Sequence, residues 1–376
     1  MNAARMARRC LREVTPYLPG KPIAEVRREL GLRKVVKLAS NENFLGPSPK
    51  ALAVLRRAAK DVHLYPEGAS PLLRRALASR YGVREGQVVV GNGSDEVIRM
   101  LCETLLEPGD EVVVSRYGFI RFKQQSMLMG AKVVEVPMSG WRHDLERMGR
   151  AAGRRTKMVF VASPNNPTGT YNTREEVSRL LGRLPSDTLL VLDEAYYEYA
   201  AGEDGYPESL PGLVRRHPNV VVLRTFSKAY GLAGLRVGVG VGSAELISWL
   251  DRVRMPFNVS LLSQRAAHAA LGDPAFVGKS VSLNAKNRGA LAAELGRLGL
   301  MTSASAANFL FVESPLPGRE LFKRLLRRGV VVRPLGEYGL SNHVRISVGS
   351  AADNRFLISA LEKVLRPAPR PARSAS

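Results

Sequence analysis

Runs of apolar and mostly β-branched residues recur along the chain between segments that repeat at helical spacing. The runs from residue 35 to residue 242 are VVKLA, QVVVGNG, EVVVS, KVVEVP, MVFVAS, LLVLDEAY, VVVLRTFS and RVGVGVG. Their apolar residues follow one another rather than alternating with polar ones, which is typical of strands covered on both faces. Right-handed β-α-β connections place helices on both faces of such a sheet. The pattern therefore predicts an α/β fold with a parallel or mixed sheet between helical layers.

The segments between these runs carry helix start and stop signals. Thr173 and Glu176 have the spacing of a capping box, and Pro185 follows as a terminator. Ser94 begins a second helical pattern that closes at Pro108. We therefore expect helices between the predicted strands.

The pattern changes near residue 255. Helical segments dominate up to residue 299, and three strand-like runs and a last helical segment follow, with the sequences NFLFVES, VVVRPL, HVRISVG and NRFLISALEKVL. We interpret residues 41–255 as a large domain and residues 256–366 as a smaller α+β domain, which residues 1–40 join as an N-terminal arm. Residues 367–376 are rich in Pro, Ala and Arg, and we predict that they are disordered.

Composition narrows the class of protein. The 376 residues are 45% hydrophobic and 24% charged, which is ordinary for a globular protein with one large and one smaller domain. No apolar run reaches the length of a membrane span, and the basic N-terminus lacks the apolar stretch of a secretory signal. Cys10 and Cys102 cannot form a disulfide framework, and the five histidines lack zinc-like spacing. We expect a cytoplasmic protein without a metal or a membrane partner.

The net charge of +22 is unusual and raises the question of a nucleic-acid partner. However, Lys and Arg are spread along helical faces, and no helix-turn-helix, RNP or zinc-finger motif accompanies them. A cofactor-fold transcription regulator would also need a DNA-binding module, for which the chain has no residues left. We therefore predict no nucleic-acid partner. A basic surface would still attract phosphorylated small molecules.

Two loops that follow predicted strands have the residues of a ligand site. GNGSDE, residues 91–96, places small residues before a helix, where backbone N–H groups and the helix dipole can hold a phosphate. Glycine-rich turns are also common for steric reasons, so this motif alone is a weak signal. SPNNPTG, residues 163–169, is more specific because prolines on both sides of two asparagines hold a side-chain amide in place.

Asp193 and Lys228 are the candidate reactive residues. Asp193 ends a strand that is predicted to be buried, and a buried carboxylate needs a partner. A salt bridge, a metal ion or the cationic ring nitrogen of a cofactor would each serve, and the scattered histidines argue against the metal. Lys228 lies in RTFSKAYGLAGLRVG, where close packing would desolvate an amine that forms imines. Ser227 and Arg236 flank it and could bind a phosphate dianion.

Taken together, the motifs resemble those of fold-type I pyridoxal-phosphate aminotransferases, specifically the histidinol-phosphate aminotransferase branch. The matching segments, in order, are PYLPGKPI, KLASNENFLGPSP, YPEG, GNGSDE, SPNNPTG, DEAY, RTFSKAYGLAGLRVG, VVVRPL and VRISVG. They cover nearly the whole chain. The resemblance implies a mostly parallel seven-stranded sheet, pyridoxal 5'-phosphate as cofactor, and a homodimer.

The resemblance also implies a role for individual residues. Lys228 would bind the cofactor covalently and act as general base, and Asp193 would pair with the ring nitrogen. Asn166 and Tyr196 would bond the ring's 3-oxygen, and Tyr117 would stack on the ring. The residues implied around the phosphate are Ser94, Asp95, Ser227 and Arg236, with Tyr65 reaching the phosphate in the neighbouring subunit. The residues implied on the substrate side are Tyr17, Asn43, Asn166, Arg333 and Arg345.

The implied reaction is amino-group transfer between L-histidinol phosphate and 2-oxoglutarate in histidine biosynthesis. Arg345 would hold a carboxylate and Arg333 a phosphate, which allows one site to bind both kinds of substrate. Two alternatives share the scaffold: an aromatic amino-acid aminotransferase and a phosphothreonine-type decarboxylase. Phe44 stands where the family usually has proline, and this departure keeps a changed substrate open.

Overall fold

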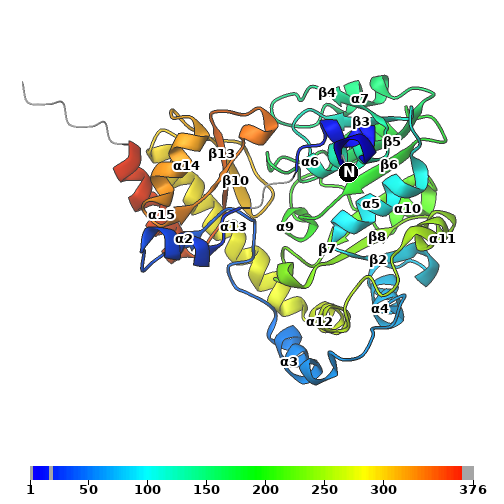
Figure 1. The fold of residues 1–376 in the computed structure, drawn as a ribbon, viewed down its shortest axis with the longest axis horizontal. Helices are drawn as coiled ribbons and strands as arrows, with labels where there is room; N and C mark the ends of the chain where they lie inside the picture. Colours follow the sequence, from blue (N-terminus) through cyan, green and yellow to red (C-terminus); the bar gives the residue numbers. More distant parts are fainter. Residues whose placement is uncertain (1–2, 17–19, 366–376) are drawn as a thin grey trace, which may run out of the picture.

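The computed structural model describes residues 3–16 and 20–365 of the chain. Tyr17, which was predicted on the substrate side, and the tail 367–376 lie outside the described residues. Two α/β units, each with its own sheet, lie side by side and are joined by the long helix α13 (Figure 1). We call them the large unit and the small unit, and their exact boundaries stay a prediction.

The large unit is built on a seven-stranded sheet with the order β2-β8-β7-β6-β5-β3-β4. Its strands are β2 (Val88–Asn92), β3 (Glu111–Ser115), β4 (Lys132–Val136), β5 (Thr156–Ala162), β6 (Leu189–Asp193), β7 (Val220–Thr225) and β8 (Val237–Val241). All neighbouring strands are parallel except β8, which runs antiparallel to both β2 and β7. Every residue of β3, β6, β7 and β8 is buried, as expected for strands covered on both faces. The predicted mostly parallel seven-stranded sheet is confirmed.

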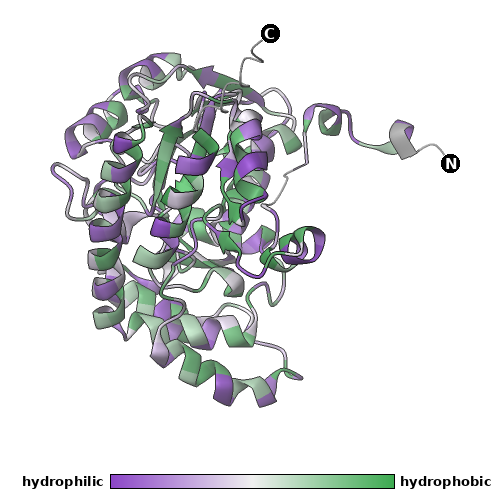
Figure 2. Cartoon of the chain, turned by 90° about the vertical axis from the view of Figure 1, so that its left-hand side faces the viewer, coloured by the Kyte–Doolittle hydropathy of each residue, from purple (hydrophilic) through white to green (hydrophobic). Residues whose placement is uncertain are grey.

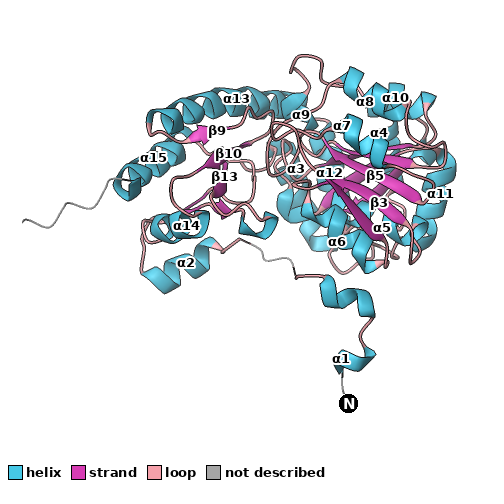
Figure 3. Ribbon diagram, turned by 90° about the horizontal axis from the view of Figure 1, so that it is seen from above, coloured by secondary structure: helices cyan, strands magenta, loops and turns pink. Residues whose placement is uncertain are grey.

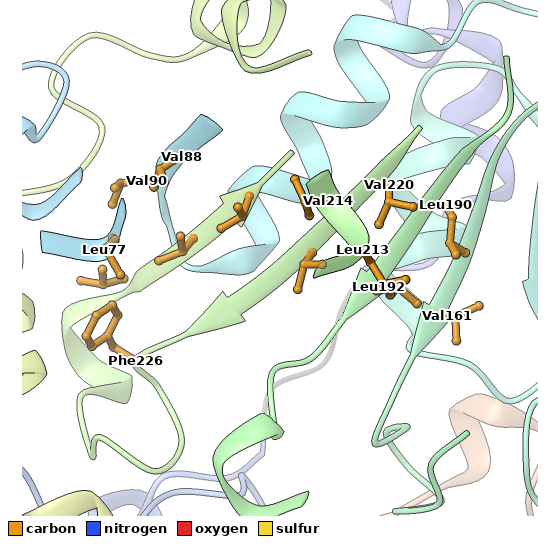
Figure 4. Close-up of a cluster of buried hydrophobic side chains, with 14 of the residues drawn as sticks. Leu77, Val88, Val90, Val161, Leu190, Leu192, Leu213, Val214, Val220 and Phe226 are labelled. Atoms are coloured by element: carbon orange, nitrogen blue, oxygen red, sulfur yellow. The ribbon is translucent and has the colours of Figure 1, made fainter. Parts of the chain in front are cut away.

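Helices cover both faces of this sheet (Figure 3). They are α3 (Pro49–Ala58), α4 (Pro71–Tyr81), α5 (Ser94–Leu105), α6 (Ile120–Leu128), α7 (Leu145–Ala151), α8 (Arg174–Leu181), α9 (Tyr197–Ala200), α10 (Gly212–Arg216), α11 (Ala244–Val253) and α12 (Leu261–Leu271). Helices α4, α7, α8, α10 and α12 contribute to one apolar core, and α5, α6 and α11 contribute to another. Along β6, Leu190 and Leu192 belong to the first core (Figure 4). Val191 belongs to the second, because successive side chains of a strand point to opposite faces.

The sequence signals at the helix ends act as predicted. Helix α8 begins after Thr173, whose hydroxyl accepts from Glu176 N at 3.3 Å, while the Glu176 carboxylate accepts from Thr173 N at 2.7 Å. Helix α5 begins at Ser94 and ends three residues before Pro108. Many helices carry both hydrophilic and hydrophobic residues, as Figure 2 shows, and α5, α8 and α11 bury the apolar ones.

The small unit has a four-stranded sheet with the order β12-β13-β10-β9. Its elements are α13 (Pro274–Arg297), β9 (Met301–Thr302), β10 (Phe309–Glu313), α14 (Gly318–Leu326), β11 (Val330–Val331), β12 (Arg333–Pro334), β13 (His343–Ser347) and α15 (Ala351–Leu365). From the N-terminal segment, α2 (Ile23–Leu30) and β1 (Val36–Lys37) join this unit, and β1 pairs in parallel with β11. The first helix, α1 (Ala3–Met6), lies apart from it, and the turn that follows contacts α6 of the large unit, where Cys10 Sγ donates to Leu128 O at 3.5 Å. Short 3-10 helices lie at Arg9–Glu13, Ala59–Asp61, Glu85–Gln87, Ala233–Leu235 and Gly336–Tyr338. Among the described residues, no helix is long and apolar enough to cross a membrane.

Candidate active site

A cavity of about 520 Å³ lies between the two units, at the carboxyl ends of β5, β6 and β7. Ligands of α/β proteins bind at this end of parallel strands, because the loops that leave the strands meet there. The cavity brings together predicted residues from distant parts of the chain: Ser94, Asp95, Asn166, Asp193, Tyr196, Ser227, Lys228, Arg236, Arg333 and Arg345.

Asp193, the last residue of β6, is a buried acid at the floor of the cavity. Its side chain is 4% exposed, and Oδ1 accepts a hydrogen bond from Ala195 N at 3.0 Å. Burial raises the pKa of Asp193 to about 7, the Ala195 N–H and the charge of Lys228 act against this rise, and Asp95 adds to it. A carboxylate in this position gains from any cationic ligand group that enters the cavity.

Lys228 follows β7 in a loop that is held tightly. Ser227 Oγ accepts from Thr225 Oγ1 at 3.0 Å, and Gly231 N donates to Lys228 O at 3.0 Å. Gly231 has a φ of +71°, and a Cβ there would collide with the backbone oxygen of Gly46. The small residues after Lys228 therefore allow the loop to lie against the segment that contains Gly46, and the amine lines the cavity.

The start of α5 forms a cradle for an anion. A Cβ on Gly238 of β8 would overlap Ser94 N, and a Cβ on Gly93 would overlap the guanidinium of Arg236. Arg236, with a φ of +54°, donates from Nη1 to Ser227 Oγ at 3.3 Å. The two glycines thus bring a guanidinium close to the N-terminus of a 12-residue helix, where backbone N–H groups and the helix dipole favour negative charge.

Arg121 is a further basic residue beside the cradle, and it is held there by Asp95. Asp95 Oδ1 accepts from Arg121 Nε at 3.0 Å, so the Asp95 carboxylate is occupied and its backbone N–H is the group at the helix start. Arg121 also lines the cavity. The sequence analysis missed Arg121, although a basic residue four positions after Tyr117 was a possible signal.

Asn166 and Tyr117 were both predicted to contact the cofactor ring, but only Asn166 lines the cavity. Asn166 lines the cavity, and its Oδ1 accepts from Arg345 Nη1. Tyr117 does not line it and instead contacts Trp141, with ring centroids 5.7 Å apart. Phe119, two residues further on, lines the cavity. The stacking role of Tyr117 therefore stays a prediction.

Asn41 and Asn43, the two asparagines of the SNEN motif (residues 40–43), have different surroundings. Asn41, which the sequence analysis did not select, lines the cavity, is 1% exposed and donates from Nδ2 to the Tyr196 hydroxyl at 2.9 Å. Asn43, which was predicted on the substrate side, does not line the cavity. Its Nδ2 donates to Ala229 O at 2.9 Å and to Ser280 Oγ at 2.8 Å, so it supports the lysine loop from outside.

Arg333 and Arg345 lie opposite each other on β12 and β13 and both line the cavity. Arg345 donates from Nη2 to Ala39 O at 2.7 Å, and its buried Nε has no partner among the described residues. Arg333 donates from Nη2 to Glu337 Oε1 at 2.6 Å and from Nε at 3.2 Å. Glu337 was missed by the sequence analysis. The two guanidinium groups form a basic wall that can bind anionic substrates.

Tyr65 lies away from this cavity on the surface of the large unit. Its side chain is 81% exposed and stacks on Phe257 with ring centroids 4.7 Å apart. Its predicted contact with a neighbouring subunit stays a prediction. Within the described ranges, no group of three or more His, Cys, Asp or Glu side chains could hold a metal ion.

Comparisons with known proteins identify the family. Residues 33–361 match the family described as aminotransferase class I and II. The chain belongs to this family. It is 48% identical to a histidinol-phosphate aminotransferase of Anaeromyxobacter sp., over 94% of this chain and 97% of the relative, and 46% identical to one of Moorella thermoacetica, over 95% and 92%. The predicted family is thereby confirmed.

A solved structure agrees with the architecture of this aminotransferase. The histidinol-phosphate aminotransferase of Sinorhizobium meliloti in complex with pyridoxal-5'-phosphate has a TM-score of 0.86 and 32% identity, covering 95% of this chain and 97% of that one. The predicted fold class is confirmed.

Proposed function

We propose that this aminotransferase uses pyridoxal 5'-phosphate and transfers an amino group between L-histidinol phosphate and 2-oxoglutarate, a step of histidine biosynthesis. The observation that carries the substrate assignment is the pair Arg333 and Arg345, which face one cavity from neighbouring strands. Relatives with the same activity in their names, at 46–48% identity over almost the whole chain, support it.

The residues present fit pyridoxal phosphate at three places. Asp193 is a buried acid that a cationic ring nitrogen would pair with. The cradle between α5 and Arg236 suits a phosphate dianion, since glycines leave it open. Lys228, which lines the same cavity, offers the primary amine. When bound, the cofactor would supply an electron sink for the electrons left when a proton departs from the substrate.

The chain's own residues account for the remaining chemistry. Lys228 Nζ is the cavity amine suited to take the proton from substrate Cα and return it in the reverse half-reaction. Ser227 and Arg236 would hold the phosphate, and the tightly packed loop would keep the lysine in reach. Tyr196 would direct its hydroxyl to the ring oxygen.

The two arginines would divide the substrate charges. Glutamate and 2-oxoglutarate carry an α-carboxylate, which the guanidinium of Arg345, a residue that lines the cavity, would bind. Histidinol phosphate lacks this group but carries a phosphate, which Arg333 would contact. A charge-assisted contact contributes roughly 1.5–3 kcal/mol, or about tenfold to a hundredfold in binding.

Single-turnover spectra against a panel of amino donors test the assignment. We expect Arg333→Ala to impair the half-reaction with histidinol phosphate about tenfold to a hundredfold, and that with phenylalanine less. Arg328→Ala, an exposed arginine of the same segment, is the matched control and should change neither. A wild-type protein that converts phenylalanine readily and histidinol phosphate hardly at all would instead be an aromatic amino-acid aminotransferase, and Phe44 would be the first residue to exchange.

We also propose a cytoplasmic homodimer in which Tyr65 reaches the phosphate site of the partner subunit. Its support is an exposed apolar patch on the large unit, where Val62 is 65%, Leu64 52%, Met255 56% and Phe257 45% exposed beside Tyr65. Such a patch marks an interaction surface. Lys228→Ala and Tyr65→Ala proteins, each inactive or impaired alone, should regain activity when mixed, because one site of the mixed dimer has both residues. No regain despite subunit exchange would contradict the shared site.

A further inference from the structure

Asn41 is buried between the two units and connects them through hydrogen bonds. It follows β1, has a φ of +55° and is 1% exposed. Its backbone N donates to Ser347 Oγ at 2.8 Å, and its backbone O accepts from Asn308 Nδ2 at 3.0 Å. Ser347 ends β13, two residues after Arg345. The position of Asn41 is therefore fixed by the strand that carries the substrate-binding arginine.

The hydrogen bonds of Ser347 fix which way the Asn41 amide points. The Ser347 oxygen accepts from Asn41 N, and its single proton is donated to Asn41 Oδ1 at 2.9 Å. A flipped amide would put Nδ2 against this hydroxyl and leave its proton without an acceptor among the described residues, in a side chain that is 3% exposed. Because buried polar groups without partners are costly, the orientation with Oδ1 toward Ser347 is the stable one.

This orientation decides the role of the Tyr196 hydroxyl. Asn41 Nδ2 lies 2.9 Å from it and can only donate, so the tyrosine oxygen accepts there. The tyrosine proton must point elsewhere. Tyr196 is 4% exposed and lines the cavity, which makes the cavity the place where that proton finds an acceptor.

We propose that Asn41 is a positioning residue that makes Tyr196 a hydrogen-bond donor to the oxygen of the cofactor ring, with Ser347 orienting the asparagine. The inference rests on the proposed use of pyridoxal phosphate. A donor at that position stabilises the ring oxygen in its anionic form. Without Asn41, the tyrosine proton is free to turn away from the ring.

The experiment is a spectrophotometric pH titration of the bound cofactor in the full-length protein. Asn41→Gly removes the amide and keeps a residue that tolerates a positive φ. We expect it to move the midpoint of the absorbance change upward by about one pH unit, as for the loss of one hydrogen bond to a charged group. In a Tyr196→Phe background the same substitution should move the midpoint by about 0.3 units or less, since the hydroxyl that Asn41 orients is gone.

Each outcome decides the proposal. An equal shift in both backgrounds, or none in the wild-type background, would overturn it. Should Asn41→Gly fail to fold or to bind cofactor, Ser347→Ala decides, because it removes only the hydroxyl that orients the amide: an upward shift that vanishes in Tyr196→Phe supports the proposal, and no shift overturns it. If cofactor binds to none of the proteins, wild type included, the proposed function itself fails.

Discussion

Asp193→Asn should stabilise the cofactor-free protein, and the gain should grow as pH rises. Asp193 is 4% exposed with one hydrogen bond, and burial raises its pKa from 3.8 to about 7. Between these two values the folded protein holds a proton at Asp193 that the unfolded chain has lost. Stability therefore falls as pH rises from about 4 to about 7 and stays low above it.

The magnitude follows from the difference in pKa. A difference of about three corresponds to about 4 kcal/mol at high pH, since each pKa unit is worth about 1.4 kcal/mol. Part of this cost is already present at pH 5, so the change between pH 5 and pH 8 is about 2–3 kcal/mol. Asparagine has the same shape and no charge. The free energy of unfolding of the variant should therefore exceed that of wild type by about 2–3 kcal/mol more at pH 8 than at pH 5.

Urea unfolding of both cofactor-free proteins at the two pH values measures this difference. Other acids, such as the half-buried Glu198, whose pKa desolvation also raises to about 7, titrate in both proteins, so their contributions to stability cancel. Pyridoxal phosphate at pH 8 should then stabilise wild type more than the variant, because only the carboxylate can pair with a cationic ring. A stability difference that is the same at pH 5 and pH 8 would refute the assignment of Asp193 as a buried acid that awaits a cation.

Three further substitutions address the lysine, the phosphate cradle and a buried ion pair. Lys228→Ala should lose both turnover and the visible absorbance of the covalently bound cofactor while circular dichroism stays unchanged, and retained transamination would show that another group is the nucleophile. Gly238→Ala should weaken cofactor binding in a fluorescence titration by at least about tenfold, because its Cβ would overlap the first backbone nitrogen of α5. Gly234→Ala, with open space around it, is the control. Arg224→Leu should cost about 3–5 kcal/mol in urea unfolding, since it leaves Glu194, 1% exposed in the side chain, without its cation; a cost below about 1 kcal/mol would contradict this.

The hydrophobic pattern predicted most of the large sheet because most of its strands are buried on both faces, although β4 is not. The run VVKLA was the exception among the predicted strands, since its residues form β1, which pairs with β11 of the small unit. Continuous apolar runs identified β5, β6 and β7, and the predicted Asp193 and Lys228 both line the cavity at their carboxyl ends. The direction of β8 was beyond this reasoning. A strand covered on both faces is apolar throughout whether it runs parallel or antiparallel, so VGVGV leaves its antiparallel pairing open.

The site was predicted less completely where side-chain direction depends on the backbone. Asn41 and Asn43 are two residues apart, and the sequence alone does not say which one faces the cavity. Asn41 has a φ of +55°, and its amide lies toward Tyr196. Because the residue at this left-handed position is not a glycine, the sequence gives no signal of that conformation. Glu337 was missed for a related reason, because its contact with Arg333 depends on the turn between β12 and β13.

Three arginines of the cavity, Arg236, Arg333 and Arg345, should differ in how strongly they bind anions, because their hydrogen-bond and ion-pair partners differ. Among the described residues, Arg236 and Arg345 form no ion pair with a carboxylate, whereas Arg333 pairs with Glu337 at 2.6 Å. The charge of Arg333 is thus partly balanced before any substrate enters, and a phosphate there would also face the Glu337 carboxylate. Anion binding should therefore be strongest at Arg236, next to a helix N-terminus, and at Arg345. It follows that the loss from Arg333→Ala should lie nearer tenfold than a hundredfold.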